Sequence, residues 1–289
     1  MTKNNIYTIG YTLFQRGSNF DLEGMYRTLH QFGVTHLVDV RSVPFSKQYP
    51  LCNEGSLRMA GKTYGIPYIH MPELGAKALP DQDVFSKASD IFFEDIFPIP
   101  KSNRPERTEL NANDEIVDFT KFRNNELLLD GLKRIENAYD KGFTLALMCS
   151  EKNPIDCHRF FLVSKKIEQQ FGTWLEVKHI VSNSIGEITT QTNSTLNKML
   201  ADIILNKTEI KKLDILNSSL FGDQPVIENY YGNNREEKIT DFCDRYWNLM
   251  HGWKKTYNTN VNDYDQIIQH RLYQKNSRTV FWNTKSKQD

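Results

Sequence analysis

Two thiols, a carboxylate, an imidazole and a guanidinium group lie within eleven consecutive positions near the middle of the chain. They belong to Cys149, Glu151, Cys157, His158 and Arg159. A thiol can act as a nucleophile, a carboxylate or imidazole can transfer a proton, and a guanidinium can hold an anion. Solubility alone does not require such a density of reactive groups, so we take this stretch as the candidate functional site.

The residues around this stretch predict the elements that position it. Residues 144–148 are a short apolar run typical of a buried strand, and a polar loop containing Pro154 follows. From Asp156 onward, apolar residues recur every three or four positions, which predicts a helix. The carboxyl end of a buried strand, followed by a helix N-terminus, is where α/β proteins place their ligands.

Small or polar residues also end two earlier predicted strands, at residues 6–10 and 34–40. They are Gly10, Tyr11 and Thr12 after the first strand, and Asp39, Arg41 and Ser42 after the second. Glycine allows the backbone to approach a ligand closely. A buried Asp and Arg need partners, because isolated charges are costly to desolvate. We expect all three strand ends to share one crevice.

The combined groups favour a phosphate-bearing ligand, either a small molecule such as a nucleotide or a nucleic acid. The candidate catalytic residues are Asp39, Glu151, His158 and Cys149. The candidate ligand-binding residues are Gly10, Tyr11, Thr12, Arg41, Ser42, Ser150, Lys152 and Arg159. Asp39 and Glu151 can also hold Mg²⁺ or exchange a proton with water. A buried ion-pair network that merely fixes the loop explains these charges equally well.

Cys149 is the alternative centre of the chemistry. A cysteine at a strand end, before a helix and near His158 and Arg159, can form a reactive thiolate, as in a sulfurtransferase-like enzyme. The compact anion loop of cysteine phosphatases requires Arg six positions after the cysteine, and Ile155 stands there. Because free cysteine is among the most buried residue types, a structural thiol is favoured over a nucleophile.

Zinc is a third possibility, with Cys149, Cys157, His158 and His70 as ligands. The spacing argues against it, because adjacent residues such as Cys157 and His158 point in different directions on a helix and no paired-ligand motif is present. No metal ligands are therefore assigned from the sequence.

Alternating strand and helix patterns predict a Rossmann-like α/β fold with a three-layer parallel sheet and right-handed crossovers. The expected strands are residues 6–10, 34–40, 66–70, 144–148 and 174–181, with Pro67 placing the third at an edge. A strand order of 3-2-1-4-5 makes the first and fourth strands neighbours and places Asp39 and Arg41 beside them.

Two regions depart from this alternation. Residues 77–120 contain Pro80, Pro98, Pro100 and Pro105 and are interpreted as an insertion, either a lid that is partly helical over residues 84–95 or a loop. The α/β domain is expected to end at residue 181. Residues 182–289 form a mainly helical region, with candidate helices at 195–205, 210–219 and 236–257. This region can bind a protein partner, and Trp253, Lys254, Lys255 and Arg271 can contact nucleic acid, although a solvated face is favoured.

The composition sets outer limits on these interpretations. The 289 residues carry no net charge, so no overall field indicates nucleic-acid or membrane binding. The four cysteines form no CxxC pair, the N-terminus carries no apolar signal segment, and no apolar run approaches membrane-spanning length. These features predict a soluble cytoplasmic protein.

Several ordered motifs, taken together, resemble the bacterial and archaeal family known as domain of unknown function 488. They are Tyr7-Thr-Ile-Gly-Tyr-Thr12, Leu37-Val-Asp-Val-Arg-Ser-Val-Pro44, Gly65-Ile-Pro-Tyr68, Leu74-Gly75 and Cys149-Ser-Glu with Cys157-His-Arg159. The resemblance covers roughly residues 5–181, implies a Rossmann-like α/β domain and brings no reaction with it. Tyr11, Ala76 and Lys47 depart from the family pattern, which often has His, Gly and Arg there.

A non-catalytic module is a different class of interpretation, in which the crevice binds a nucleotide signal and residues 182–289 bind a partner. The sequence does not decide between this module and an enzyme, and apart from Mg²⁺ it indicates no cofactor.

Overall fold

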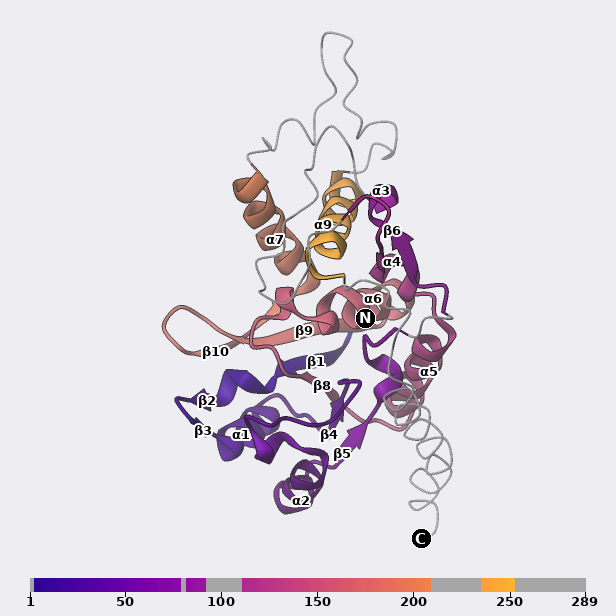
Figure 1. Cartoon of the computed structure of the whole chain (residues 1–289). Coiled ribbons are helices and arrows are strands. Elements are labelled where there is room, and N and C mark those ends of the chain that lie inside the picture. Colours follow the sequence, from indigo (N-terminus) through magenta and orange to yellow (C-terminus); the bar gives the residue numbers. More distant parts are fainter. Residues whose placement is uncertain (1–2, 79–81, 92–110, 209–234, 253–289) are drawn as a thin grey trace, which may run out of the picture.

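A six-stranded, mostly parallel sheet with helices on both faces forms the core of the protein (Figure 1). The computed structural model describes residues 3–78, 82–91, 111–208 and 235–252. A helical C-terminal part packs beside the sheet. This arrangement confirms the α/β fold class expected from the sequence, and a Rossmann-like description fits it.

The strands of the main sheet follow one another in the order β10, β9, β1, β8, β4 and β5. Their bounds are β10 Ile188–Thr192, β9 Leu175–Ser182, β1 Asn4–Gly10, β8 Leu145–Cys149, β4 His36–Asp39 and β5 Tyr68–His70. All neighbouring pairs are parallel except β9 and β10. Two small antiparallel pairs stand apart: β2 (Gln15–Arg16) with β3 (Asn19–Phe20), and β6 (Phe85–Lys87) with β7 (Glu115–Val117).

The expected strand order was wrong because β1 and β8 exchange places. β4 pairs with β8 and not with β1, and β9 pairs with β1 and not with β8, so β8 lies between β1 and β4. Every residue of β8 is buried, and a strand of this kind is stable where neighbours cover both its edges and both its faces. The expected proximity nevertheless holds, because Asp39 is in register with Met148, the residue before Cys149.

Strand β10 was missed by the sequence interpretation, which ended the sheet at residue 181. It returns antiparallel to β9 after a turn in which Gly186 has a φ of 87°. Its sequence, Ile-Thr-Thr-Gln-Thr, lacks the apolar alternation that marks a half-buried strand. Threonine is common in strands, but a run of polar residues does not by itself predict a strand.

Helices α1 (Leu22–Gln31) and α2 (Glu54–Tyr64) cover one face of the sheet, and α5 (Glu126–Asp140) and α6 (Lys165–Phe171) cover the other. Asp21 caps α1 by accepting from the Gly24 amide, and Asn125 caps α5 by accepting from the Leu127 amide. Short 3-10 turns link these elements: η1 Tyr11–Phe14, η2 Pro50–Cys52, η3 Pro72–Leu74 and η4 Pro154–Asp156. A π-helical turn, η5 (Arg159–Ser164), leads directly into α6.

Side chains of β8 alternate between these two faces. Leu145, Leu147 and Cys149 pack in the core with α5 and α6, whereas Ala146 and Met148 pack in the core with α1 and α2. Because parallel strands in register point equivalent residues to the same side, Asp39 shares the side of Met148 and lies opposite Cys149.

The described part of the insertion begins with strand β6 and helix α3 (Ala88–Ile91), where a helix from 84 to 95 was expected. Strand β7 and helix α4 (Phe119–Phe122) follow after residues that lie outside the described part. A small apolar cluster joins this insertion to the C-terminal helix α9 (Arg235–His251); its members are Ala88, Ile91, Ile116 and Leu249.

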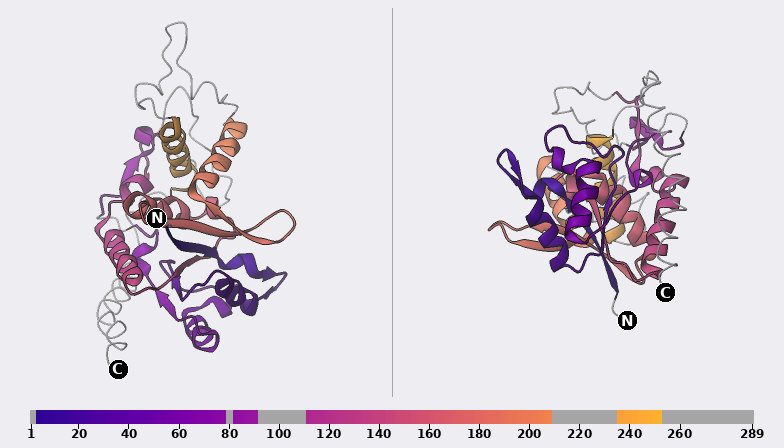
Figure 2. Two further views of the ribbon diagram at one scale, coloured as in Figure 1. Left: turned by 180° about the vertical axis from the view of Figure 1, so that it is seen from behind. Right: turned by 90° about the horizontal axis from the view of Figure 1, so that it is seen from below.

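Helices α7 (Asn193–Thr208) and α9 lie side by side, as Figure 2 shows from two further directions. They confirm two of the three helices expected after residue 182, while the third, at 210–219, lies outside the described residues, as do Trp253, Lys254, Lys255 and Arg271. Asp244 fastens α9 to the core through buried ion pairs with Arg123 and Lys165. Among the described residues, no helix combines the length and apolar character needed to cross a membrane.

Candidate functional site

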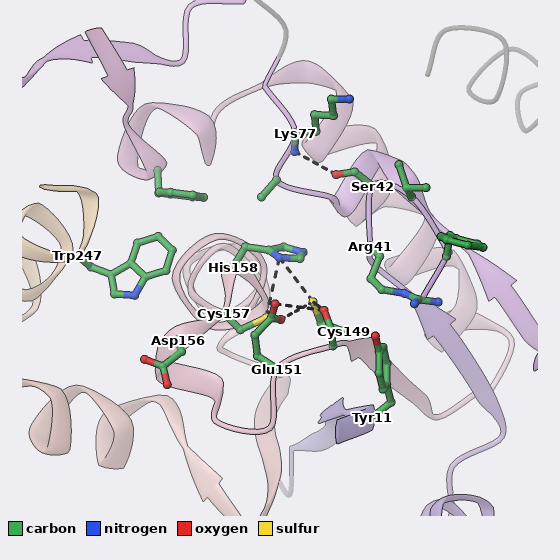
Figure 3. Close-up of a pocket in the computed structure, with 15 residues that line it drawn as sticks. Tyr11, Arg41, Ser42, Lys77, Cys149, Glu151, Asp156, Cys157, His158 and Trp247 are labelled. Carbon is green, nitrogen blue, oxygen red and sulfur yellow. Dashed lines mark hydrogen bonds between the residues drawn. The ribbon is translucent and has the colours of Figure 1, made fainter. Parts of the chain in front are cut away.

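A cavity of about 410 Å³ opens at the carboxyl ends of β1, β4 and β8 (Figure 3). Its lining comes from strand-end loops, the insertion and α9. The lining residues are Tyr11, Arg41, Ser42, Val43, Phe45, Ala76, Lys77, Phe119, Cys149, Ser150, Glu151, Asp156, Cys157, His158 and Trp247. Seven of the candidate catalytic and ligand-binding residues are among them: Tyr11, Arg41, Ser42, Cys149, Ser150, Glu151 and His158. Cys157, which the sequence analysis considered as a zinc ligand, lines the cavity as well.

The centre of the cavity holds a compact cluster of two sulfurs and one imidazole. One ligand atom from each of Cys149, Cys157 and His158 lies within 4.8 Å of the other two. The Nδ1 atom of His158 is 3.7 Å from Cys149 Sγ and 3.9 Å from Cys157 Sγ. Glu151 borders this cluster and accepts a hydrogen bond from Cys149 Sγ at 3.1 Å.

Cys157 and His158 point to the same place because Cys157 lies before the helical segment and only His158 has helical backbone angles, with φ −59° and ψ −23°. Cys157 has an extended backbone, with φ −131° and ψ 141°, and His158 is the residue immediately before η5. The sequence interpretation placed both on a helix and therefore separated their side chains. His70, the fourth residue considered there, is buried, and its Nε2 lies 2.7 Å from the Arg41 carbonyl oxygen.

The local environment sets the protonation of this cluster. Burial, together with the neighbouring Cys157, raises the pKa of the Cys149 thiol well above its ordinary value. Burial would also raise the pKa of Glu151, but hydrogen bonds from Cys157 and Cys149 lower it to about 2. Burial opposes a charge on His158, yet interactions with Cys149 and Glu151 raise its pKa. A protonated, 3% exposed thiol at Cys149 is a poor nucleophile in this state.

Three residues expected to touch a ligand instead shape the loop after β8. A Cβ atom on Gly10 would lie 1.8 Å from the Glu151 carbonyl oxygen, so glycine is needed for the loop to pass there. Thr12 Oγ1 donates to the Ser150 carbonyl at 2.6 Å. Arg159, with no exposed surface, donates from Nη1 to the Glu151 carbonyl at 2.5 Å and from Nη2 to the Lys152 carbonyl at 3.1 Å.

Lys152 is exposed and does not line the cavity. The loop that carries Ser150 and Glu151 is thus held from η1 and from η5 by hydrogen bonds to its carbonyl groups. Gly10, Thr12 and Arg159 position the site and do not themselves face the cavity.

Asp39 belongs to a buried network on the opposite face of the sheet, which reaches the cavity only through Arg41. Its Oδ2 accepts from Arg41 Nη2 at 2.5 Å and from the Tyr68 hydroxyl at 2.7 Å. Oδ1 accepts from Arg41 Nε at 2.9 Å, and Arg41 Nη2 also donates to the Cys52 carbonyl. With both carboxylate oxygens engaged and no exposed surface, Asp39 is not placed to hold Mg²⁺ together with Glu151.

The far wall of the cavity is formed by residues that the sequence interpretation did not select. Trp247 of α9 stacks on Phe161 at 4.0 Å between ring centroids and meets Phe119 edge-on at 4.7 Å. Its Nε1 donates to the Ile155 carbonyl at 2.9 Å, which ties α9 to the loop before Cys157. Sequence spacing gives no signal for these contacts, because Trp247 is almost one hundred positions away from Ile155.

Lys77 and Asp156 are further lining residues that were not selected, although both lie close to motifs that were. Lys77 follows Leu74-Gly75-Ala76, and its backbone amide donates to Ser42 Oγ at 3.1 Å. Asp156 precedes Cys157 in the loop itself. Their proximity to these motifs was the signal that could have identified them.

Comparison with known families supports part of this picture. The family described as Domain of unknown function DUF488 matches residues 21–97. The match confirms the resemblance over α1, β4, α2 and β5, and over the strand-end loops that supply Arg41, Ser42 and Lys77. The cysteines of the central cluster lie outside the matched residues. No curated protein and no solved structure matches the chain.

Proposed function

We propose that the cavity binds a small phosphate-bearing ligand of nucleotide type. The observation that supports this most directly is the division of one cavity into a cationic side and an aromatic side. In Figure 3, Lys77, Ser42 and Arg41 lie on one side and Trp247 on the other, with the Cys149 cluster between them. A nucleotide is divided in the same way, with an anionic phosphate for the cationic side and a flat base for the aromatic side.

The cationic side offers donors for a phosphate. Lys77 is half-buried, and among the described residues its ammonium group has no ion-pair partner. The Ser42 hydroxyl accepts from the Lys77 amide, so its own proton is available for a ligand. Arg41 is 6% exposed, and its buried Nη1 has no hydrogen-bond partner among the residues that the structure describes. Charge-assisted hydrogen bonds from such groups are the strong contacts in phosphate recognition.

The aromatic side of the cavity is lined by two largely buried rings, Phe119 at 1% and Trp247 at 5% exposed. Phe119 and Trp247 both line the cavity, and their mutual edge-on packing fixes their orientation. Aromatic side chains stack on nucleobases whatever the base, with a contribution of about 1–3 kcal/mol per base. The cavity volume of about 410 Å³ lies toward the small end of ligand sites, which suits a single nucleotide.

Calorimetric titration of the full chain with AMP, GMP, CMP and UMP, in the presence of EDTA, tests the proposal. Titrations with the corresponding nucleosides and with inorganic phosphate measure the affinity for the base and sugar and the affinity for the phosphate separately. Lys77→Ala should weaken nucleotide binding by roughly 10–100-fold, the value of one charge-assisted hydrogen bond, and leave nucleoside binding unchanged.

Lys47→Ala is the matched control, because Lys47 is an exposed lysine of the neighbouring loop that does not line the cavity. Equal nucleotide affinities for the Lys77→Ala and Lys47→Ala proteins would overturn the proposal, as would the absence of nucleotide binding by the unmodified chain.

A further inference from the structure

We propose that Cys149, Cys157 and His158 form a site for one divalent transition-metal ion of the zinc class. Three protein ligands would leave a fourth position open toward Glu151 and the cavity. This inference concerns the centre of the same cavity, but it does not depend on nucleotide binding.

The distances between the ligand atoms suit tetrahedral coordination. Zinc–sulfur bonds of about 2.3 Å and zinc–nitrogen bonds of about 2.0 Å place neighbouring ligand atoms roughly 3.5–3.8 Å apart. The His158 Nδ1 atom lies 3.7 Å from Cys149 Sγ and 3.9 Å from Cys157 Sγ. The three ligand atoms, all within 4.8 Å of one another, therefore need only small side-chain movements to enclose an ion.

The second hydrogen-bonding atom of His158 provides an independent reason. Its Nε2 lies 3.2 Å from the Val40 carbonyl oxygen at the end of β4. A carbonyl can only accept, so Nε2 carries a proton in this contact, and Nδ1 is the ring atom that faces the two sulfurs. A metal ion would take the lone pair of Nδ1 by displacing any proton held there, as it displaces the thiol protons. Metal-binding histidines nearly always donate their other ring N–H to such a partner, which fixes the ring for coordination.

Cys157 has similar support from the backbone. The amide of Arg159 donates to Cys157 Sγ at 3.5 Å, at the start of a helical segment that runs through η5 and α6. An N–H donor and the positive end of a helix both stabilise negative charge on a thiolate. Metal binding would displace the thiol protons of Cys149 and Cys157 to solvent.

The donor set selects the class of ion. Thiolate and imidazole ligands favour zinc and related transition metals, whereas Mg²⁺ and Ca²⁺ prefer oxygen ligands. Glu151 is a neighbour of the cluster, with Oε2 3.1 Å from Cys149 Sγ. A site with three protein ligands and one open position is the arrangement of zinc centres that bind water or a ligand, whereas structural zinc sites are closed by four protein ligands.

Cobalt substitution tests the site with a spectroscopic signature specific to thiolate ligands. The reduced, EDTA-treated full chain is titrated with Co²⁺ alone and then with Zn²⁺, without any nucleotide. We expect one Co²⁺ per chain, a thiolate-to-cobalt charge-transfer band, and its loss as Zn²⁺ displaces Co²⁺. Cys149→Ser and Cys157→Ser should each weaken Zn²⁺ binding by more than about 100-fold, since even outer-shell changes cost 10–100-fold.

Cys52→Ser is the matched control, because Cys52 is an equally buried free thiol in the core on the other face of the sheet. Unfolding of every variant in EDTA confirms that it is folded before titration. His158→Gln provides a test that changes no cysteine, since His158 is only half-buried and glutamine retains an N–H donor for Val40. It should lower Zn²⁺ affinity and preserve a weakened charge-transfer band.

A wild-type chain that shows no charge-transfer band with Co²⁺ would overturn the metal site. So would Cys149→Ser, Cys157→Ser and His158→Gln proteins that bind Zn²⁺ as tightly as Cys52→Ser. Because the nucleotide titration contains EDTA and the metal titration contains no nucleotide, failure of one proposal is distinguishable from failure of the other.

Discussion

Two groups of ionisable side chains lie beside one helical segment, residues 158–171, and they differ in whether their members face a cavity or are paired with one another. Near its start, Cys149, Glu151, Cys157 and His158 face a cavity. Seven residues beyond His158, Lys165 joins Arg123 around Asp244, and each of these three side chains is at most 6% exposed. The Asp244 group has opposite charges in contact, whereas the cavity group brings together sulfur and nitrogen atoms of the kind that bind metals.

The difference separates a structural network from a candidate site. Both carboxylate oxygens of Asp244 are occupied by cations, one from α6 and one beside α4, so no position is left for a ligand. Arg123 also donates to the carbonyl of Phe161 in the π-helical turn, at 2.8 Å. In a regular α-helix this carbonyl would accept a hydrogen bond from a backbone amide. Ionisable groups whose hydrogen-bonding atoms are all paired within the protein are typical of a structural network. Ionisable groups that meet at an open cavity are typical of a binding or catalytic site.

Removal of Asp244 should give the largest effect on folding. Asp244→Ala leaves Arg123 and Lys165 buried without their counter-charge, and we expect a loss of about 3–5 kcal/mol in the free energy of unfolding. Urea denaturation measures this loss. Asp241→Ala, which breaks the partly exposed pair with Arg245 on the same helix, should cost less than about 1 kcal/mol. Similar losses for the two variants would contradict a clamping role for Asp244.

A methyl group on Gly10 should have the next largest effect. Gly10→Ala places a Cβ against the Glu151 carbonyl and should destabilise the fold by about 1–3 kcal/mol through overpacking. Gly55 of α2, where an added Cβ meets no atom within 4 Å, is the matched control. Gly55→Ala should be neutral or slightly stabilising in the same denaturation experiment. If the two substitutions have equal effects, the close approach at Gly10 does not constrain the loop.

His179 should make stability depend on pH, with a smaller amplitude. This buried residue of β9 contacts Thr8 and Asn193, each at 2.7 Å. Burial lowers its pKa to about 3, while the same residue in the unfolded chain titrates near its ordinary value. Between these values the unfolded state binds the additional proton, so stability is complete above about pH 6.5 and falls as the pH decreases.

From pH 7.5 to 5.5, His179 should contribute a loss of about 1.4 kcal/mol in the free energy of unfolding. His179→Gln cannot take up this proton, so its stability should decline less over the same interval. Denaturation at both pH values measures the two losses, and equal losses would show that His179 is not held in the neutral form.

Glu151 should have the smallest effect on stability. The hydrogen bonds that lower its pKa stabilise the charged form, but Glu151 is exposed at the cavity and solvent screens its charge. Glu151→Gln also keeps an acceptor oxygen, so the free energy of unfolding should change by less than about 1 kcal/mol. A large loss of stability in this variant would place Glu151 with the structural network of Asp244 and not with the candidate site.

Local sequence patterns predicted the parts of the fold that depend on local periodicity. The apolar run before Cys149 and the change to helical spacing after Asp156 correspond to β8 and to the segment formed by η5 and α6. The order of the strands was not predictable in this way, because the position of β8 between β1 and β4 depends on pairing over long distances. The polar strand β10 likewise depends on its neighbour β9 more than on its own residues.

The candidate site shows the same division. Strand-end motifs identified Cys149, Glu151, His158, Arg41 and Ser42, all of which belong to the cavity or its border. Asp39 lies away from the cavity because of strand alternation: its register with Met148 turns its side chain to the face opposite Cys149. The convergence of Cys157 and His158 required backbone angles that the sequence does not specify, and Trp247 reaches the cavity only through the docking of α9.

The wall formed by Trp247 has a consequence for biosynthesis. The cavity lies between Tyr11 and Trp247, which is made more than two hundred residues after Tyr11. All the strands that carry the central cluster are complete long before α9 leaves the ribosome. A nascent chain can therefore assemble its sheet while the Ile155 carbonyl still lacks the indole N–H of Trp247. During translation, a folded core would precede a finished cavity, because α9 emerges after every strand of the main sheet.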